Sequence, residues 1–136
     1  MTRGERNNNP LNIRRTKSKW LGLKEEVKDK AFCEFRTLPY GFRAAFKLFQ
    51  SYYLKHKCIT LRQVISRWAP ESENNTKAYI DTVAKYTGIN PDDMLPSPMK
   101  SKDTWVGIAI AMGRVECNKV FPRAMAEAGY DMSVLR

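Results

Sequence analysis

A glutamate on the apolar face of a predicted helix is the residue in this chain best suited to acid–base chemistry. The 102–117 segment predicts the longest apolar helix, and Glu116 shares a face with three of its apolar residues: Met112, Ala109 and Trp105. The spacings of four, seven and eleven bring these residues to one face because a helix advances by roughly 100° per residue. A carboxyl group there loses hydration, which raises its pKa and suits it to act as a general acid in glycosidic cleavage. The alternative is a frayed helix end, where Glu116 points to solvent or pairs with an arginine.

The opening of the chain concentrates amide side chains. Residues 3–14 read RGERNNNPLNIR. Asparagine both donates and accepts hydrogen bonds, as sugar hydroxyls and N-acetyl groups require. Asparagine also favours turns, so these side chains either bind a ligand or only stabilise the loop. The candidate ligand-binding residues here are Arg3, Asn7, Asn8, Asn9 and Asn12.

Glu5 is the weaker candidate for a catalytic carboxylate. Glycosidases commonly use two carboxylates, and Glu5 lies inside the asparagine-rich opening. Its neighbours Arg3 and Arg6 offer the alternative of a surface ion pair. Glu5 is therefore a second-carboxylate candidate only if the structure brings it close to Glu116.

Aromatic and cationic side chains complete the set of candidates. Trp20, Trp68 and Tyr79 have rings that could stack on sugars, although Trp68 lies on an apolar helical stripe and also suits core packing. Arg67 could orient a carboxylate of a muramic residue or its peptide, or pair with one of the nearby glutamates.

Composition indicates a single domain over residues 1–136. Residues 1–70 hold 16 Lys and Arg against 5 Asp and Glu, whereas residues 71–136 hold 8 against 9, within a net charge of +10. Such a one-sided field attracts polyanions, including nucleic acid and an anionic cell wall. No apolar stretch is long enough to span a bilayer and no secretory signal is present, so we expect synthesis in the cytoplasm and delivery to a wall by other means, such as a virion, a holin or lysis.

Cysteine and histidine usage predicts no metal site and no cofactor. Cys33, Cys58 and Cys117 match no zinc or redox spacing, and His56 is the single histidine. We expect buried free thiols.

The elements that must position Glu116 are mostly helices. A short hairpin is predicted from residues 20–27 and 31–36, after an irregular segment over residues 1–16. Helices are then predicted from Pro39, behind a capping box of Thr60 and Gln63, from a Thr76 cap to Gly88, over 102–117, and over 122–128. The fold class is therefore mainly α (α+β), with helices around one small hairpin near the N-terminus.

Two stretches carry a family resemblance. Residues 108–118, IAIAMGRVECN, resemble the helix that ends in the catalytic glutamate of lytic transglycosylases and goose-type lysozymes, with Val115, Glu116 and Asn118 matching and Cys117 departing. The opening RGERNNNPLNIR, followed by Trp20 and Gly22, resembles that of phage "structural protein" lysozyme-like domains. The central block RWAP at residues 67–70, followed by EN at 73–74 and YI at 79–80, resembles the same family. Leu11 stands where that family usually has glycine.

The resemblance implies a lysozyme-superfamily fold and cleavage of peptidoglycan glycan strands by a muramidase or lytic transglycosylase. Bacterial peptidoglycan would be the partner, together with phage virion proteins. The glutamate helix comes last in this chain, as if the order were circularly permuted. That hypothesis predicts that Glu116 and the Asn7–Asn12 segment meet across one cleft. Two alternatives stay open: a non-catalytic virion or wall-binding module, and a basic helical DNA-binding protein.

Overall fold

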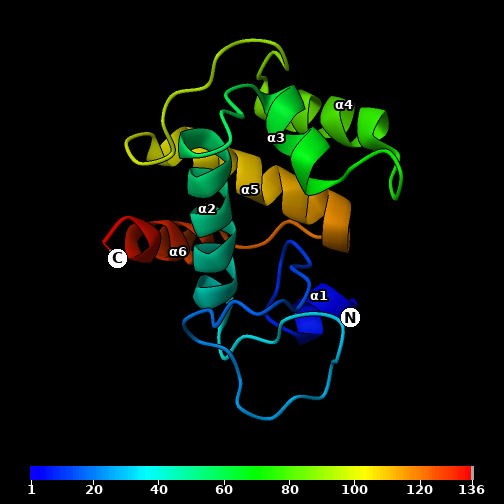
Figure 1. The fold of residues 1–136 in the computed structure, drawn as a ribbon, viewed down its shortest axis with the longest axis vertical. Helices are drawn as coiled ribbons and strands as arrows, with labels where there is room; N and C mark the ends of the chain where they lie inside the picture. Colours follow the sequence, from blue (N-terminus) through cyan, green and yellow to red (C-terminus); the bar gives the residue numbers. More distant parts are fainter. Residues whose placement is uncertain (136) are drawn as a thin grey trace.

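The computed structural model describes residues 1–135, and the fold over this range is mainly α, as predicted (Figure 1). Six helices form within it: α1 (Arg3–Arg6), α2 (Leu38–Leu54), α3 (Leu61–Trp68), α4 (Thr76–Thr87), α5 (Lys102–Cys117) and α6 (Arg123–Leu135). In this range no helix combines the length and apolar character that a bilayer crossing requires.

Aromatic side chains of α2 form the centre of the core. Phe42, Phe46 and Phe49 are fully buried on the face that their spacing predicts. Phe49 lies 5.5 Å from Trp105 of α5, and Phe46 lies 5.3 Å edge-on to Tyr130 of α6, measured between ring centroids. These ring contacts fix both α5 and α6 against α2, and α5 in turn packs against α4 (Figure 1).

Local signals define the ends of two helices close to the site. Thr60 and Gln63 form the predicted capping box at the start of α3, and Gly88 ends α4 with φ of 73°, in the left-handed region that glycine adopts without strain. The predicted cap of α4 is displaced by one residue. Asn75 caps the helix by accepting from the Ala78 N–H, because the Thr76 hydroxyl instead donates to the Ala69 carbonyl.

The predicted hairpin does not form as a pair of strands within the described residues. Isolated antiparallel bridges join Leu23 to Phe35 and Arg14 to Phe32. The second arm instead bonds to the 13–15 segment: the Cys33 N–H donates to the Ile13 carbonyl, and the Arg15 N–H donates to the Ala31 carbonyl. Two side-chain carboxylates take further N–H groups of this loop. Asp29 accepts from the N–H groups of residues 31 and 32, and Glu34 accepts from those of residues 28 and 29.

The N-terminal segment packs directly beneath the C-terminal end of α5 (Figure 1). Its start, predicted to be irregular, forms the single turn α1, closed by a capping box between Thr2 and Glu5. A methyl group at Gly4 would overlap Cys117 Sγ, so this glycine is required for the close approach of the two segments. The close approach places the asparagine-rich loop next to the last turn of α5.

Candidate functional site

The carboxyl group of Glu116 lies at the meeting point of three segments. Helix α5 remains regular to Cys117 and ends at Asn118, whose φ of 50° is left-handed, so Glu116 is not on a frayed end. Asn12 Nδ2 donates to Glu116 Oε1 at 3.1 Å, and the Tyr79 hydroxyl of α4 donates to Oε2 at 2.9 Å. Both oxygens therefore have uncharged donors as partners.

Burial raises the pKa of Glu116 above that of an ordinary glutamate. Hydrogen bonds from Asn12, Tyr79 and Trp68 act in the opposite direction because they favour the ionised form, but burial has the larger effect. The residue is half-buried rather than sealed, so its carboxyl group remains reachable from solvent. A carboxyl group of raised pKa beside open space is what a general acid needs.

A groove of about 510 Å³, here called the Glu116 groove, runs past this carboxyl group. Its walls come from the N-terminal segment, α2, α3, the loop after α3, and α5. The lining residues are Asn12, Ile13, Arg14, Thr16, Phe32, Leu48, Tyr52, Trp68, Ala69, Glu73, Asn74 and Glu116. Aromatic rings, amides and charged groups thus line one open trough, a mixture that fits a polar polymer with apolar sugar faces.

A second hollow, of about 340 Å³, lies on the other side of Glu116. Glu116 and Asn74 line both hollows, while Tyr79, Thr82 and Val115 line only the second. The glutamate therefore stands between two open spaces, so an extended chain molecule could occupy both and present an internal bond to it.

Asn12 is the asparagine that the fold brings to the glutamate. Its φ of 52° lies in the left-handed region, where asparagine is tolerated better than most residues. Besides the carboxylate, Asn12 Nδ2 lies 3.3 Å from the backbone carbonyl of Glu116. The prediction that the asparagine-rich opening meets Glu116, over a hundred residues later in the chain, is thereby confirmed for Asn12.

Asn7, Asn8 and Asn9 hold the loop together. Asn7 donates to Asp29 at 2.9 Å, and Asn8 donates to the carbonyls of residues 35 and 36. Asn9 is fully buried, donates to the carbonyls of Ile13 and Cys33, and accepts from the Ile13 N–H. Of the two interpretations given for these three side chains, the contacts favour stabilisation of the loop.

Glu5 and Arg3 lie outside both hollows beside Glu116. Glu5 closes the cap of α1 and pairs with Lys119 at 3.1 Å, contacts that lower its pKa to about 2. A carboxylate this acidic holds no proton near neutrality. Arg3 forms a two-pronged ion pair with Asp29, at 2.7 and 3.2 Å.

The aromatic candidates divide between groove and core. Trp68 packs on Phe49 at 5.4 Å, as its core-packing interpretation predicts, and it also lines the groove, where stacking on a sugar stays a prediction. Tyr79 is almost fully buried, and burial together with the neighbouring Glu116 raises its pKa well above the usual value. Trp20 lines a separate hollow beside Lys47, and Arg67 lies over the Tyr52 ring at 5.2 Å without lining the groove.

Arg14 and Glu73 line the groove although the composition and spacing of the chain did not single them out. Both belong to stretches that carry the family resemblance, which was the available signal. The three cysteines are buried and free, as expected, and within residues 1–135 no cluster of His, Cys, Asp and Glu has the makings of a metal site.

Comparison with known proteins gives a partial relationship to a phage protein. Protein P5 of Pseudoalteromonas phage PM2 is 43% identical over 90 residues, which cover 64% of this chain and 56% of that protein. The chain thus spans little more than half the length of the phage protein. No family model matches the chain. A relationship to a phage protein is therefore established for about two thirds of the chain.

The start of α1 and the end of α6 lie on opposite sides of the molecule (Figure 1). A circular permutation is most easily accommodated where the ends of a domain are close together. The contact between Asn12 and Glu116 agrees with the permuted arrangement, whereas the separation of the ends gives it no support. The permutation stays a hypothesis.

Proposed function

We propose that this protein cleaves the glycan strands of peptidoglycan, with Glu116 as the general acid. The observation that carries the proposal is a carboxyl group of raised pKa, held by uncharged donors, between two open hollows. The resemblance of residues 108–118 to the glutamate helix of lytic transglycosylases adds to it. The phage context of the relative is compatible with wall cleavage.

The proposed reaction uses the Glu116 carboxyl group twice, first as an acid and then as a base. Glu116 protonates the glycosidic oxygen as the bond from that oxygen to the anomeric carbon breaks, and an oxocarbenium-like centre is left behind. The Glu116 carboxylate then takes a proton either from water or from the C6 hydroxyl of the same sugar. The deprotonated oxygen bonds to the anomeric carbon and the acid is restored. Water gives a reducing end, and the C6 hydroxyl gives an anhydro end.

Release of muropeptides from purified sacculi tests this proposal. We expect the wild-type chain to release fragments. Glu116→Gln should release them at least about a hundredfold more slowly, because a general acid typically contributes that much to the rate. Glu127→Gln is the matched control, because Glu127 lies on α6, pairs with Arg123 and lines neither hollow beside Glu116. Mass spectrometry of the products separates reducing from anhydro ends. Equal, negligible release from wild type and Glu116→Gln would refute the proposal and leave a binding module.

A second function, nucleic-acid binding, is favoured by one specific observation. A hollow of about 610 Å³ beside α1 is lined by five cations, Arg3, Arg6, Lys24, Lys28 and Lys30, with Asn7, Asp29 and Glu34. Phosphate contacts make DNA affinity fall steeply with salt. Salt-sensitive binding of duplex DNA that is lost on neutralising Lys24, Lys28 and Lys30, in a protein without lytic activity, would support this function over the first.

A further inference from the structure

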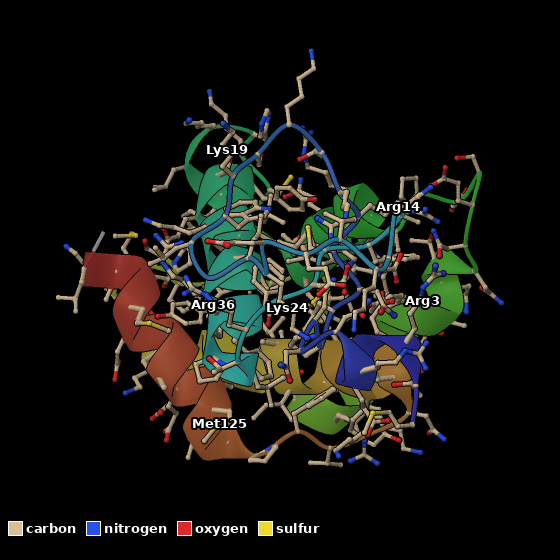
Figure 2. The ribbon with its side chains drawn as sticks, turned by 90° about the horizontal axis from the view of Figure 1, so that it is seen from below. Arg3, Arg14, Lys19, Lys24, Arg36 and Met125 are labelled. Carbon is tan, nitrogen blue, oxygen red and sulfur yellow. The ribbon has the colours of Figure 1, made fainter. Side chains whose placement is uncertain are left out.

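One wall of the Glu116 groove carries an arginine fixed on an aromatic ring. Arg14 and Phe32 both line the groove, and an isolated backbone bridge holds the two residues side by side. The guanidinium carbon of Arg14 lies 4.6 Å from the Phe32 ring centroid, and that of Arg3 lies 4.5 Å from the same centroid. Stacking on the ring restrains the Arg14 head group beside the groove. In Figure 2, Arg3 and Arg14 lie on the same side of the face formed by the N-terminal segments.

The neighbouring arginines are neutralised, whereas Arg14 is not. Arg3 pairs with Asp29 at 2.7 Å, and Arg15 pairs with Glu34 at 2.8 Å. Among the ion pairs found in residues 1–135, none includes Arg14, whose side chain is exposed. Its planar fork of donors is therefore available to an anion, and it matches the geometry of a carboxylate.

The charged groups that line the groove are arranged unequally. Glu73 and Glu116 reach it from the loop after α3 and from α5, whereas Arg14 and Phe32 belong to the N-terminal segment. An acidic substituent on a bound polymer is repelled by the negative charge of Glu73 and attracted by the Arg14 guanidinium. This arrangement favours the orientation in which such a substituent points to Arg14.

We propose that Arg14 is an anion subsite for the carboxylate carried on the 3-O-substituent of a muramic residue in the groove. The inference rests on the proposed function and names the feature of the glycan that the groove selects. The carboxylate has two sources: the lactyl group itself, where the peptide has been removed, or the stem peptide attached to it. Arg67, the arginine that the sequence suggested for this role, lies over the Tyr52 ring and does not line the groove.

Binding to three forms of solubilised glycan strand tests the subsite. The strands are peptide-bearing, stripped of peptide by an amidase, or converted to neutral amides with carbodiimide and ammonia. Dissociation constants are measured for full-length Glu116→Gln, which prevents turnover, with and without Arg14→Gln. The matched control is Arg36→Gln, since Arg36 is an exposed arginine on the same face that stacks on Tyr40 and lines neither hollow beside Glu116 (Figure 2).

We expect the parent to bind acidic strands about three- to tenfold tighter than neutral strands, in the range of a charge-assisted contact. Arg14→Gln should reduce this ratio to near one, Arg14→Lys should retain part of it, and Arg36→Gln should leave it intact. Preference for stripped strands over amides identifies the lactyl carboxylate as the ligand, whereas preference confined to peptide-bearing strands identifies the stem peptide.

Two outcomes overturn the subsite: a ratio that survives in Arg14→Gln, or an equal loss in Arg14→Gln and Arg36→Gln, which would mean a diffuse charge effect. Both are distinguishable from failure of the proposed function. If the wild type is active and Arg14→Gln keeps the same ratio of affinities for acidic and neutral strands, only the subsite is refuted. If the wild type is inactive, the proposed cleavage reaction is refuted, while the ratio of binding affinities still tests the role of Arg14.

Discussion

Two glutamates of this molecule, Glu34 and Glu116, are both shielded from solvent but have opposite kinds of hydrogen-bond partner. Glu34 is 4% exposed and accepts from the Arg15 guanidinium at 2.8 Å and from two backbone N–H groups of the 28–29 turn. Glu116 is less buried, and its side-chain donors, Asn12 and Tyr79 among them, are uncharged. One carboxylate is surrounded by positive charge and amide dipoles, and the other is not.

The difference in partners reverses the direction of the pKa shift. Burial alone would raise the pKa of both groups. At Glu34 the backbone hydrogen bonds and Arg15 outweigh burial and lower the pKa, whereas at Glu116 burial outweighs its hydrogen bonds and raises it. Glu34 is thus fixed as an anion that organises a loop. Glu116 is left able to exchange a proton beside a groove.

The largest expected effect is the loss of activity in Glu116→Gln, together with a gain in stability. The raised folded pKa means that the native state keeps a proton that the unfolded state releases, so wild-type stability falls as pH rises from the ordinary glutamate pKa through the higher folded value. We therefore expect Glu116→Gln to have a higher Tm than wild type at pH 7 and an equal Tm below about pH 4. Thermal unfolding followed by circular dichroism across this pH range measures the difference. A lower Tm of the variant at pH 7 would mean that Glu116 is a structural carboxylate like Glu34.

Glu34→Gln should lower the stability of the protein at pH 7, the reverse of the effect expected for Glu116→Gln. Its lowered folded pKa contributes stability above the unfolded pKa, and this contribution is lost as pH falls through the folded value. We expect the variant to lose about 2 kcal/mol of unfolding free energy at pH 7, because a charge-assisted contact to Arg15 is removed from a buried site. Urea denaturation measures the loss, with Glu127→Gln, an exposed pair on α6, as the control expected to change it by less than about 0.5 kcal/mol. A neutral outcome for Glu34→Gln would remove the contrast between the two carboxylates.

A smaller effect is expected from Tyr79→Phe. The Tyr79 hydroxyl donates to Glu116 and favours its ionised form, so removal of the hydroxyl should raise the pKa of Glu116 further. Because the acid must be protonated, the alkaline limb of the kcat/KM profile should move to higher pH. Below that limb we expect kcat/KM to fall by no more than about fivefold, the worth of one hydrogen bond. A limb that stays in place, or moves to lower pH, would show that another group sets it.

The sequence was sufficient to predict the helix and the face that present Glu116. An apolar repeat over α5 and a capping box on α3 are local patterns, and local patterns are confirmed here. The meeting of Asn12 with Glu116 required the family resemblance and the permutation hypothesis as well, since no local signal links residues so far apart.

The failures share a physical cause. In the predicted hairpin, residues 31 and 33 bond to the backbone of the 13–15 segment, while Asp29 accepts from the N–H groups of residues 31 and 32 and from the side chain of Asn7. Long-range side-chain to backbone contacts of this kind compete with regular pairing and have no periodicity to reveal them. The role of Arg14 could not be predicted from the sequence for a related reason. It depends on the ion pairs that Arg3 and Arg15 form with carboxylates, and no local pattern reveals those pairs.

The smallest expected effect is that of Glu5→Gln. Glu5 pairs with Lys119 and caps α1, outside both hollows beside Glu116, and its pKa of about 2 leaves it ionised throughout the working range. A second catalytic carboxylate would lose most of its activity on this change, whereas we expect less than a twofold change in muropeptide release, within the small effects typical of exposed ion pairs. Glutamine retains an acceptor for the Thr2 N–H, so the cap should persist with a slightly lower Tm. The paired comparison is Glu73→Gln, since Glu73 lines the groove and Glu5 does not. If Glu5→Gln abolishes muropeptide release while Glu73→Gln retains it, the active centre extends to α1. Glu5 would then be a proton-transferring carboxylate and not a structural one.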